Sequence, residues 1–118
     1  MRVRVQFMLL ALAAFSVSAW SGAPPPAPQA VSVYLSLGSR QCQDGGRTLA
    51  QVRQLLADAG VRVLSSGCGT DGMAYPAVCG APDGRIVILE VPAEQVEAAR
   101  KAGFALLSER PRAQRQAC

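Results

Sequence analysis

The segment Val31-Ser-Val-Tyr-Leu-Ser-Leu37 alternates apolar and polar residues with a period of two. Its valines and leucines therefore fall on one face of a strand, and its serines and tyrosine fall on the other. After a glycine-rich stretch, Thr48-Leu-Ala-Gln51 matches a capping box, and apolar residues then recur at helical spacing. Gly60 is placed as the left-handed cap of that helix. We expect a strand, a helix and then a second short strand over residues 61–65.

The second half of the chain repeats this order. Ile86-Val-Ile-Leu89 is apolar at every position, which is typical of a strand covered on both faces. Pro92 suits the first turn of a helix, and acidic residues near its start and basic residues near its end complement the helix dipole. Gly103 caps this helix, and Ala105-Leu-Leu-Ser108 predicts a last strand.

Two β-α-β units joined by a hairpin predict an α+β fold, a ferredoxin-like βαββαβ two-layer sandwich stabilised by disulfides. Right-handed crossovers give an antiparallel sheet of order 4-1-3-2 with both helices on one face. We expect four parts in the chain. These are a signal peptide (1–19), a Pro-rich flexible lead (20–30), the βαββαβ domain (31–109) and a basic C-terminal tail (110–118).

The first nineteen residues have the pattern of an export signal. Arg2 and Arg4 form a short basic leader, residues 7–15 are apolar, and Val17-Ser-Ala19 has the spacing of a cleavage site. The apolar run is shorter than the roughly 20 residues that cross a bilayer. We therefore expect a periplasmic or secreted protein, with no membrane insertion after signal cleavage and with cysteines paired in disulfides.

Composition argues against several classes of function. The formal net charge of +4 falls to +2 without Arg2 and Arg4, because ten Lys and Arg then face eight Asp and Glu. Nucleic-acid binders usually carry a basic stripe with aromatic platforms, so we expect no nucleic-acid partner. The chain has no histidine, which removes the commonest general base and metal ligand. We expect no catalytic residues, no enzymatic activity and no cofactor.

The predicted topology brings three cysteines to one edge of the sheet. Cys42 follows the first strand, Cys68 follows the second and Cys79 precedes the third, whereas Cys118 ends a tail that leaves from the opposite edge and would have to fold back to reach them. Four cysteines allow three complete pairings, and Cys79 lies within reach of both Cys42 and Cys68. We favour Cys68–Cys79, which would staple a long loop, with Cys42–Cys118 as its complement. The separations of 26, 11 and 39 residues match no zinc motif.

The long loop over residues 65–84 is the candidate binding surface. Loops of more than about 12 to 15 residues in a compact domain are usually functional or disordered. Its tip carries apolar and rigid side chains that suit an interface, and two arginines lie at the same edge of the sheet. The predicted binding residues are Met73, Tyr75, Pro76, Arg40 and Arg47. In the alternative, Tyr75 folds down onto the domain and closes its open end.

Three Asp-Gly pairs lie at this same edge, with the aspartates at Asp44, Asp71 and Asp83. Turn chemistry explains them, because Asp tolerates tight turns and Gly supplies positive φ. In the alternative, the three carboxylates and loop carbonyls form a calcium-type site, although their spacing matches no EF-hand.

The sheet face without helices is predicted to need a cover. Ile86 and Ile88 point to one side of their strand and Val87 and Leu89 to the other, so one apolar pair faces away from the helices. Leu64 on the neighbouring strand adds to this patch. An exposed apolar patch of this kind usually marks an interface. We expect a second copy of the chain or a partner protein to cover it, with the Pro-rich lead or the basic tail as alternatives.

The run Val-Tyr-Leu-Ser-Leu-Gly-Ser at 33–39, with a leucine-rich helix ending in Ala-Gly-Val at 59–61, resembles SPOR domains. These are exported modules of the same β-α-β-β-α-β order that bind peptidoglycan. The likeness covers residues 31–63 and carries no site residue across. We expect a small exported binding domain with a protein partner. The alternative is a SPOR-like binder of cell-envelope glycan, and the third reading is a carboxylate- or metal-dependent enzyme.

Overall fold

The structure of the chain, a computed structural model, describes residues 13, 14, 16, 22 and 29–118. The predicted signal peptide and Pro-rich lead fall largely outside these residues. The described part contains one sheet of five strands in the order β4-β1-β3-β2-β5, and every neighbouring pair is antiparallel. The strands are β1 (Ala30–Ser36), β2 (Ser65–Thr70), β3 (Arg85–Pro92), β4 (Ala105–Leu106) and β5 (Gln114–Gln116). The helical elements are α1 (Leu49–Asp58), η1 (Ala93–Gln95), α2 (Val96–Lys101) and η2 (Leu107–Glu109).

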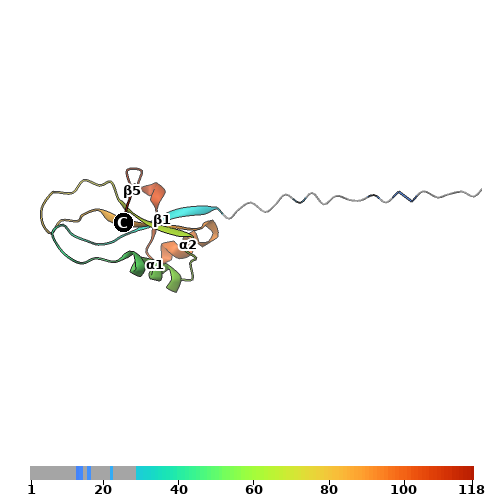
Figure 1. Cartoon of the computed structure of the whole chain (residues 1–118), viewed down its shortest axis with the longest axis horizontal. Helices are drawn as coiled ribbons and strands as arrows, with labels where there is room; N and C mark the ends of the chain where they lie inside the picture. The colour runs from blue at the N-terminus through green and yellow to red at the C-terminus, as the bar shows by residue number, and fades with distance from the viewer. Residues whose placement is uncertain (1–12, 15, 17–21, 23–28) are drawn as a thin grey trace, which may run out of the picture.

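The α+β class is confirmed, with both α1 and α2 on one side of the sheet (Figure 1). The predicted four-stranded order 4-1-3-2 is not matched, because a fifth strand extends the sheet beyond β2. That strand, β5, comes from the segment predicted to be a basic tail. Its sequence Gln-Arg-Gln has no apolar alternation, so nothing local marks it as a strand.

The first helix forms as its sequence predicts. The Gln51 amide donates to Thr48 Oγ1 at 3.1 Å, and the Thr48 amide donates to Gln51 Oε1 at 2.9 Å, which completes the capping box. Gly60 has a φ of 73° and ends the helical segment in the left-handed region. Val52 and Leu56 are the buried side chains of this helix.

The second strand lies further along the chain than predicted. Residues 61–65 were expected to form it, but β2 spans Ser65–Thr70 and includes Gly67 and Gly69. Val61 packs into the core, and the ladder begins where the Leu64 amide donates to the Glu90 carbonyl at 2.8 Å. The first six residues of the predicted long loop therefore belong to the sheet.

The second β-α-β half also differs in detail. Pro92 ends β3 instead of opening a helix, and the single turn η1 separates it from α2. The last predicted strand shortens to β4, since residues 107–109 form the turn η2.

The central strand β3 is buried on both faces, as its composition predicts. Val87, Leu89 and Val91 face the helices and belong to the main core cluster with Val33 and Leu56. The alternate residues Ile86 and Ile88 lie on the face without helices, and each is only 1% exposed.

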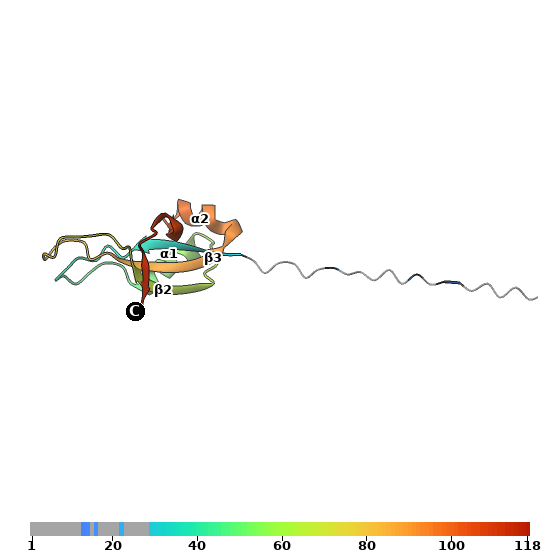
Figure 2. The same ribbon diagram turned by 90° about the horizontal axis from the view of Figure 1, so that it is seen from above.

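Residues 110–118, which we call the strap, lie on that second face. Because β4 and β5 are at opposite edges of the sheet, the chain between them must pass across β1, β3 and β2. Figure 2 shows the red C-terminal segment crossing the strands toward β2, and Figure 1 shows it on the side away from α1 and α2.

Two arginines attach the strap to residues that neighbour Ile88. Arg110 Nε donates to the hydroxyl of Tyr34, the cross-strand neighbour of Ile88. Arg115 donates to Glu90 at 2.6 Å, two residues along β3 on the same face. The basic tail, predicted as an alternative to a second copy or a partner protein, thus lies over this face, and of the predicted patch Leu64 is exposed.

Candidate functional site

The β1–β3 ladder continues past the ends of both strands into a two-stranded extension. The Leu37 amide donates to the Arg85 carbonyl at 3.0 Å, the Gln41 amide donates to the Ala81 carbonyl at 2.9 Å, and Arg40 and Pro82 form an antiparallel bridge. We call residues 37–43 and 71–84 the arm. Figures 1 and 2 show it projecting beyond the sheet at one end.

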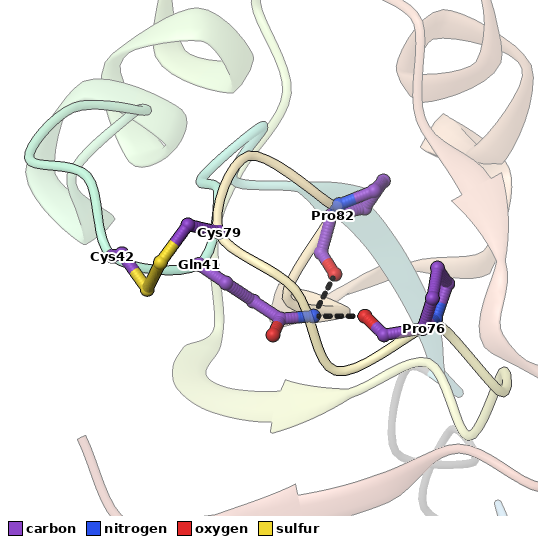
Figure 3. Close-up of a disulfide and its surroundings, with 5 residues drawn as sticks. All are labelled: Gln41, Cys42, Pro76, Cys79 and Pro82. Carbon is purple, nitrogen blue, oxygen red and sulfur yellow. Dashed lines mark hydrogen bonds between the residues drawn. A yellow bond between two sulfur atoms is a disulfide. The ribbon is translucent and has the colours of Figure 1, made fainter.

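A disulfide between Cys42 and Cys79 cross-links the arm (Figure 3). The favoured pairing of Cys79 with Cys68 is therefore wrong. The physical reason is register: Ser36 pairs with Ile86 and Arg40 with Pro82, so the continued ladder places Cys42 opposite Gly80, one residue from Cys79. In the same region Gln41 Nε2 donates to the carbonyls of Pro76 at 2.9 Å and Pro82 at 3.2 Å, which joins the two segments of the arm.

The second disulfide joins Cys68 to Cys118, so the predicted Cys42–Cys118 bridge is also wrong. Cys68 lies within β2, directly opposite Gln116 of β5, where the strap reaches the edge of the sheet. All four cysteines are paired, as the sequence predicts. Two disulfides indicate that the protein folds in an oxidising compartment.

Tyr75 folds back onto the arm. Its hydroxyl donates to Asp71 Oδ2 at 2.5 Å, and the Met73 amide donates to Asp71 Oδ1 at 2.9 Å. A Cβ added to Gly84 would lie 3.0 Å from Asp71 Oδ1 and 3.1 Å from Tyr75 Cε2, so the ring packs closely against this glycine. The hydrogen bond to Asp71, together with desolvation and the carboxylate charge, raises the pKa of Tyr75.

The arm nevertheless carries exposed apolar side chains. Met73 is 52% exposed, Tyr75 37% and Val78 56%. In the described part of the chain the other exposed large apolar side chains are Leu55 and Leu64. Three of these five exposed apolar side chains therefore lie in one six-residue span of the arm, residues 73–78. Val78 was not singled out from the sequence, where it reads as an ordinary loop residue before Cys79.

The five predicted binding residues do not form one cluster. Arg40 lines an open depression together with Tyr75 and Asp71, and its guanidinium donates to the Gly80 carbonyl at 2.8 Å. Arg47 lies apart, with its side chain on the Ser36 carbonyl at 3.4 Å. Pro76 is exposed and contributes its carbonyl to the bond from Gln41.

The strap adds two arginines that sequence reasoning did not place here. Arg110 Nε donates to the Tyr34 hydroxyl at 2.8 Å, and Arg110 Nη1 lies 3.9 Å from Met73 Sδ. The hydrogen bond to Tyr34 raises the pKa of Arg110, which stays protonated. Arg112 lines a second depression with Met73 and Asp71. Their place could be known only once the path of the strap was known.

Two of the three candidate aspartates, Asp71 and Asp83, accept hydrogen bonds from the arm's own backbone and side chains, and Asp44 lines an open depression together with Asp83. Asp83 accepts from Ser39 Oγ at 2.8 Å and from the Arg85 amide at 3.0 Å. Desolvation raises the pKa of Asp83, but these hydrogen bonds and the nearby Arg85 charge outweigh it and lower the pKa overall. Within the described residues, no three His, Cys, Asp or Glu side chains gather closely enough to hold a metal ion.

In the part of the chain that the structure describes, no helix has the length and apolar character to cross a membrane. Comparison with protein-family models, with curated proteins and with solved structures finds no match to this chain. The likeness of residues 31–63 to SPOR domains therefore has no family match behind it.

Proposed function

We propose that this protein is a small exported domain, periplasmic or secreted, that binds another protein through the arm. The observation that carries the proposal is the gathering of exposed Met73, Tyr75 and Val78 on one ordered projection. Aromatic residues, Met and Arg are enriched at protein interfaces, and Tyr and Arg often dominate their binding energy.

The order of the arm supports this proposal. The Cys42–Cys79 disulfide, the bonds from Gln41 and the Tyr75–Asp71 contact hold the loop in one conformation. A loop that is ordered before binding loses less conformational entropy when a partner binds. The strap covers the sheet face that the sequence suggested for self-association, so we place the partner on the arm instead.

We further infer that β1 to β4 and the two helices form a ferredoxin-like βαββαβ unit to which β5 is added. The relative order 4-1-3-2 of those four strands supports this reading. Such a fold hosts many functions, so the binding role rests on the arm and not on the fold.

The test uses the full exported protein with both disulfides formed. It is immobilised and exposed to protein extracts from the envelope and the culture medium of the cells that produce it. We expect a partner that wild type retains and that Met73→Ser with Val78→Ser reduces at least tenfold. The matched control, Leu55→Ser with Leu64→Ser, removes two exposed apolar side chains outside the arm and should keep the partner.

SPOR-like glycan binding is the other outcome of this test. Co-sedimentation with protease-treated peptidoglycan sacculi should leave the protein in the supernatant. Pelleting that survives the arm substitutions would overturn the proposal in favour of a glycan binder. If the control variant Leu55→Ser with Leu64→Ser loses the protein partner to the same extent, the arm is not the binding surface.

A further inference from the structure

We infer that the partner of the arm presents an acidic segment, with carboxylates on either side of an apolar residue. This inference rests on the proposed function and names the chemical class of the partner. It comes from the arrangement of three arginines around the exposed apolar residues of the arm.

The ion pairs in the described part of the chain use Arg85, Arg100 and Arg115. Arg40 is bonded instead to a backbone carbonyl, and Arg110 is bonded to a hydroxyl and lies against a thioether. Their guanidinium groups therefore keep most of their charge and donor capacity for a further acceptor.

Two adjoining depressions place these cations at both ends of the apolar patch. One is lined by Arg40 and Tyr75, the other by Arg112 and Met73, and both are lined by Asp71 and Gly84. Arg110 lies beside Met73, at the second end. The patch therefore has a cation at one end, Tyr75 and Met73 in the middle, and cations at the other end.

The two carboxylates inside this arrangement, Asp71 and Asp83, are already engaged. Asp83 accepts from the Ser39 hydroxyl and from the Arg85 amide. Asp71 accepts from the Tyr75 hydroxyl with one oxygen and from the Met73 amide with the other, so it orders the loop. Guanidinium groups bind carboxylates in bidentate geometry, which gives both energy and orientation. An acidic segment with a central apolar side chain complements this surface, whereas an uncharged glycan leaves the arginines without partners.

The probe is a synthetic peptide of alternating Glu and Leu, compared with the peptide in which Gln replaces every Glu. Binding to the full, oxidised protein is followed by fluorescence anisotropy, and the site by amide chemical shifts. We expect at least tenfold tighter binding of the Glu peptide at low salt, weakening in 0.5 M NaCl, with shifts at Met73 and Tyr75. Equal affinity for the two peptides overturns the inference, and so does tighter binding of an oligo-dT strand.

Substitutions of single arginines and arginine pairs test which cations bind the Glu peptide. Arg110→Gln with Arg112→Gln should weaken the Glu peptide at least tenfold, and Arg40→Gln alone, which leaves the strap intact, should weaken it severalfold. Arg53→Gln with Arg62→Gln removes two arginines outside the arm and strap and should have no effect. An equal loss in this control overturns the inference.

The native partner separates this inference from the proposed function. If Met73→Ser with Val78→Ser releases that partner while the arginine variants retain it, arm binding stands and the acidic segment is rejected. If all these variants retain it, the proposed function fails as well.

Discussion

The two faces of the sheet are covered by different kinds of contact. On one face, α1 and α2 bury a continuous apolar cluster that includes Leu56, Val87 and Leu89. On the other, the strap buries Ile86 and Ile88 while contributing a disulfide, two arginine contacts and a short ladder with β2.

This difference separates two sources of stability. Apolar packing on the helix face is distributed over many residues and depends little on salt or redox conditions. The strap face depends on a few specific links, each of which can be removed singly. We therefore expect the apolar cluster on the helix face to unfold cooperatively. The contacts of the strap face should be removable one at a time.

The largest expected effect is on the helix face. Leu56 is fully buried in the core, and Leu56→Ala should lower the free energy of unfolding by about 2 to 5 kcal/mol. Urea denaturation measures this loss. The neighbouring Leu55→Ala, at an exposed position, should cost less than about 0.5 kcal/mol. A similar loss from both variants would contradict the assigned core.

Removing the strap disulfide should come next. Cys68→Ser with Cys118→Ser opens a link between residues 50 positions apart and should cost about 2 to 4 kcal/mol. It should also increase binding of an apolar dye, because the strap then uncovers Ile86 and Ile88.

The arm disulfide is the matched control for that prediction. Cys42→Ser with Cys79→Ser opens a link of 37 positions, so its stability loss should be similar, but dye binding should stay low. Dye binding that rises equally in both double variants would show that the strap is not what covers the second face.

A glycine pair tests how closely the strap approaches β2. A Cβ on Gly69 would lie 2.5 Å from the Gln114 carbonyl oxygen and 2.8 Å from Ile88 Cδ1, whereas a Cβ on Gly67 meets no atom within 4 Å. Gly69→Ala should therefore destabilise the protein by about 1 to 3 kcal/mol. Gly67→Ala, two residues away in the same strand, should be neutral or slightly stabilising. Thermal unfolding of the two variants decides, and equal effects would refute the close approach.

The strap's ion pair should contribute less. Arg115 donates to Glu90 at 2.6 Å, and both side chains retain solvent contact, so Arg115→Gln should cost about 0.5 to 1 kcal/mol. The loss should shrink in 1 M NaCl because salt screens the pair. Arg100→Gln, in a more open pair with Glu97 and Glu109, should cost less. A salt-independent loss would point to packing by the arginine stem.

The smallest effect concerns Tyr75, at the arm end of the strap face. Its pKa is raised because the protonated hydroxyl donates to Asp71. The stabilising contribution is therefore fully present below the ordinary tyrosine pKa of about 10, and it is lost as the pH rises through the raised pKa of the folded state. An ultraviolet titration of the Tyr34→Phe protein should show Tyr75 ionising later than a model tyrosine. Asp71→Asn should remove most of that delay, and a normal titration in the parent would disprove the bond.

Short-range patterns predicted much of this fold. The alternation of Val31 to Leu37, the capping box at Thr48 and the apolar run from Ile86 each depend on neighbours within a few residues. Such features can therefore be recognised from a short stretch of sequence. They predicted the α+β class, α1, β1 and β3, and export predicted that the cysteines pair.

Long-range pairing decided the rest. The glycines of β2 predicted a loop from the sequence. In the structure the strap passes so close to Gly69 that a side chain at this position would collide with it. Cys79 had two possible partners in the sequence, and the continued β1–β3 register selected Cys42. The sequence placed Arg110 and Arg112 in a basic tail, and only the path of the strap shows that they lie beside Met73. Contacts between residues tens of positions apart depend on register and chain path, which no local window contains, and they placed the candidate binding surface.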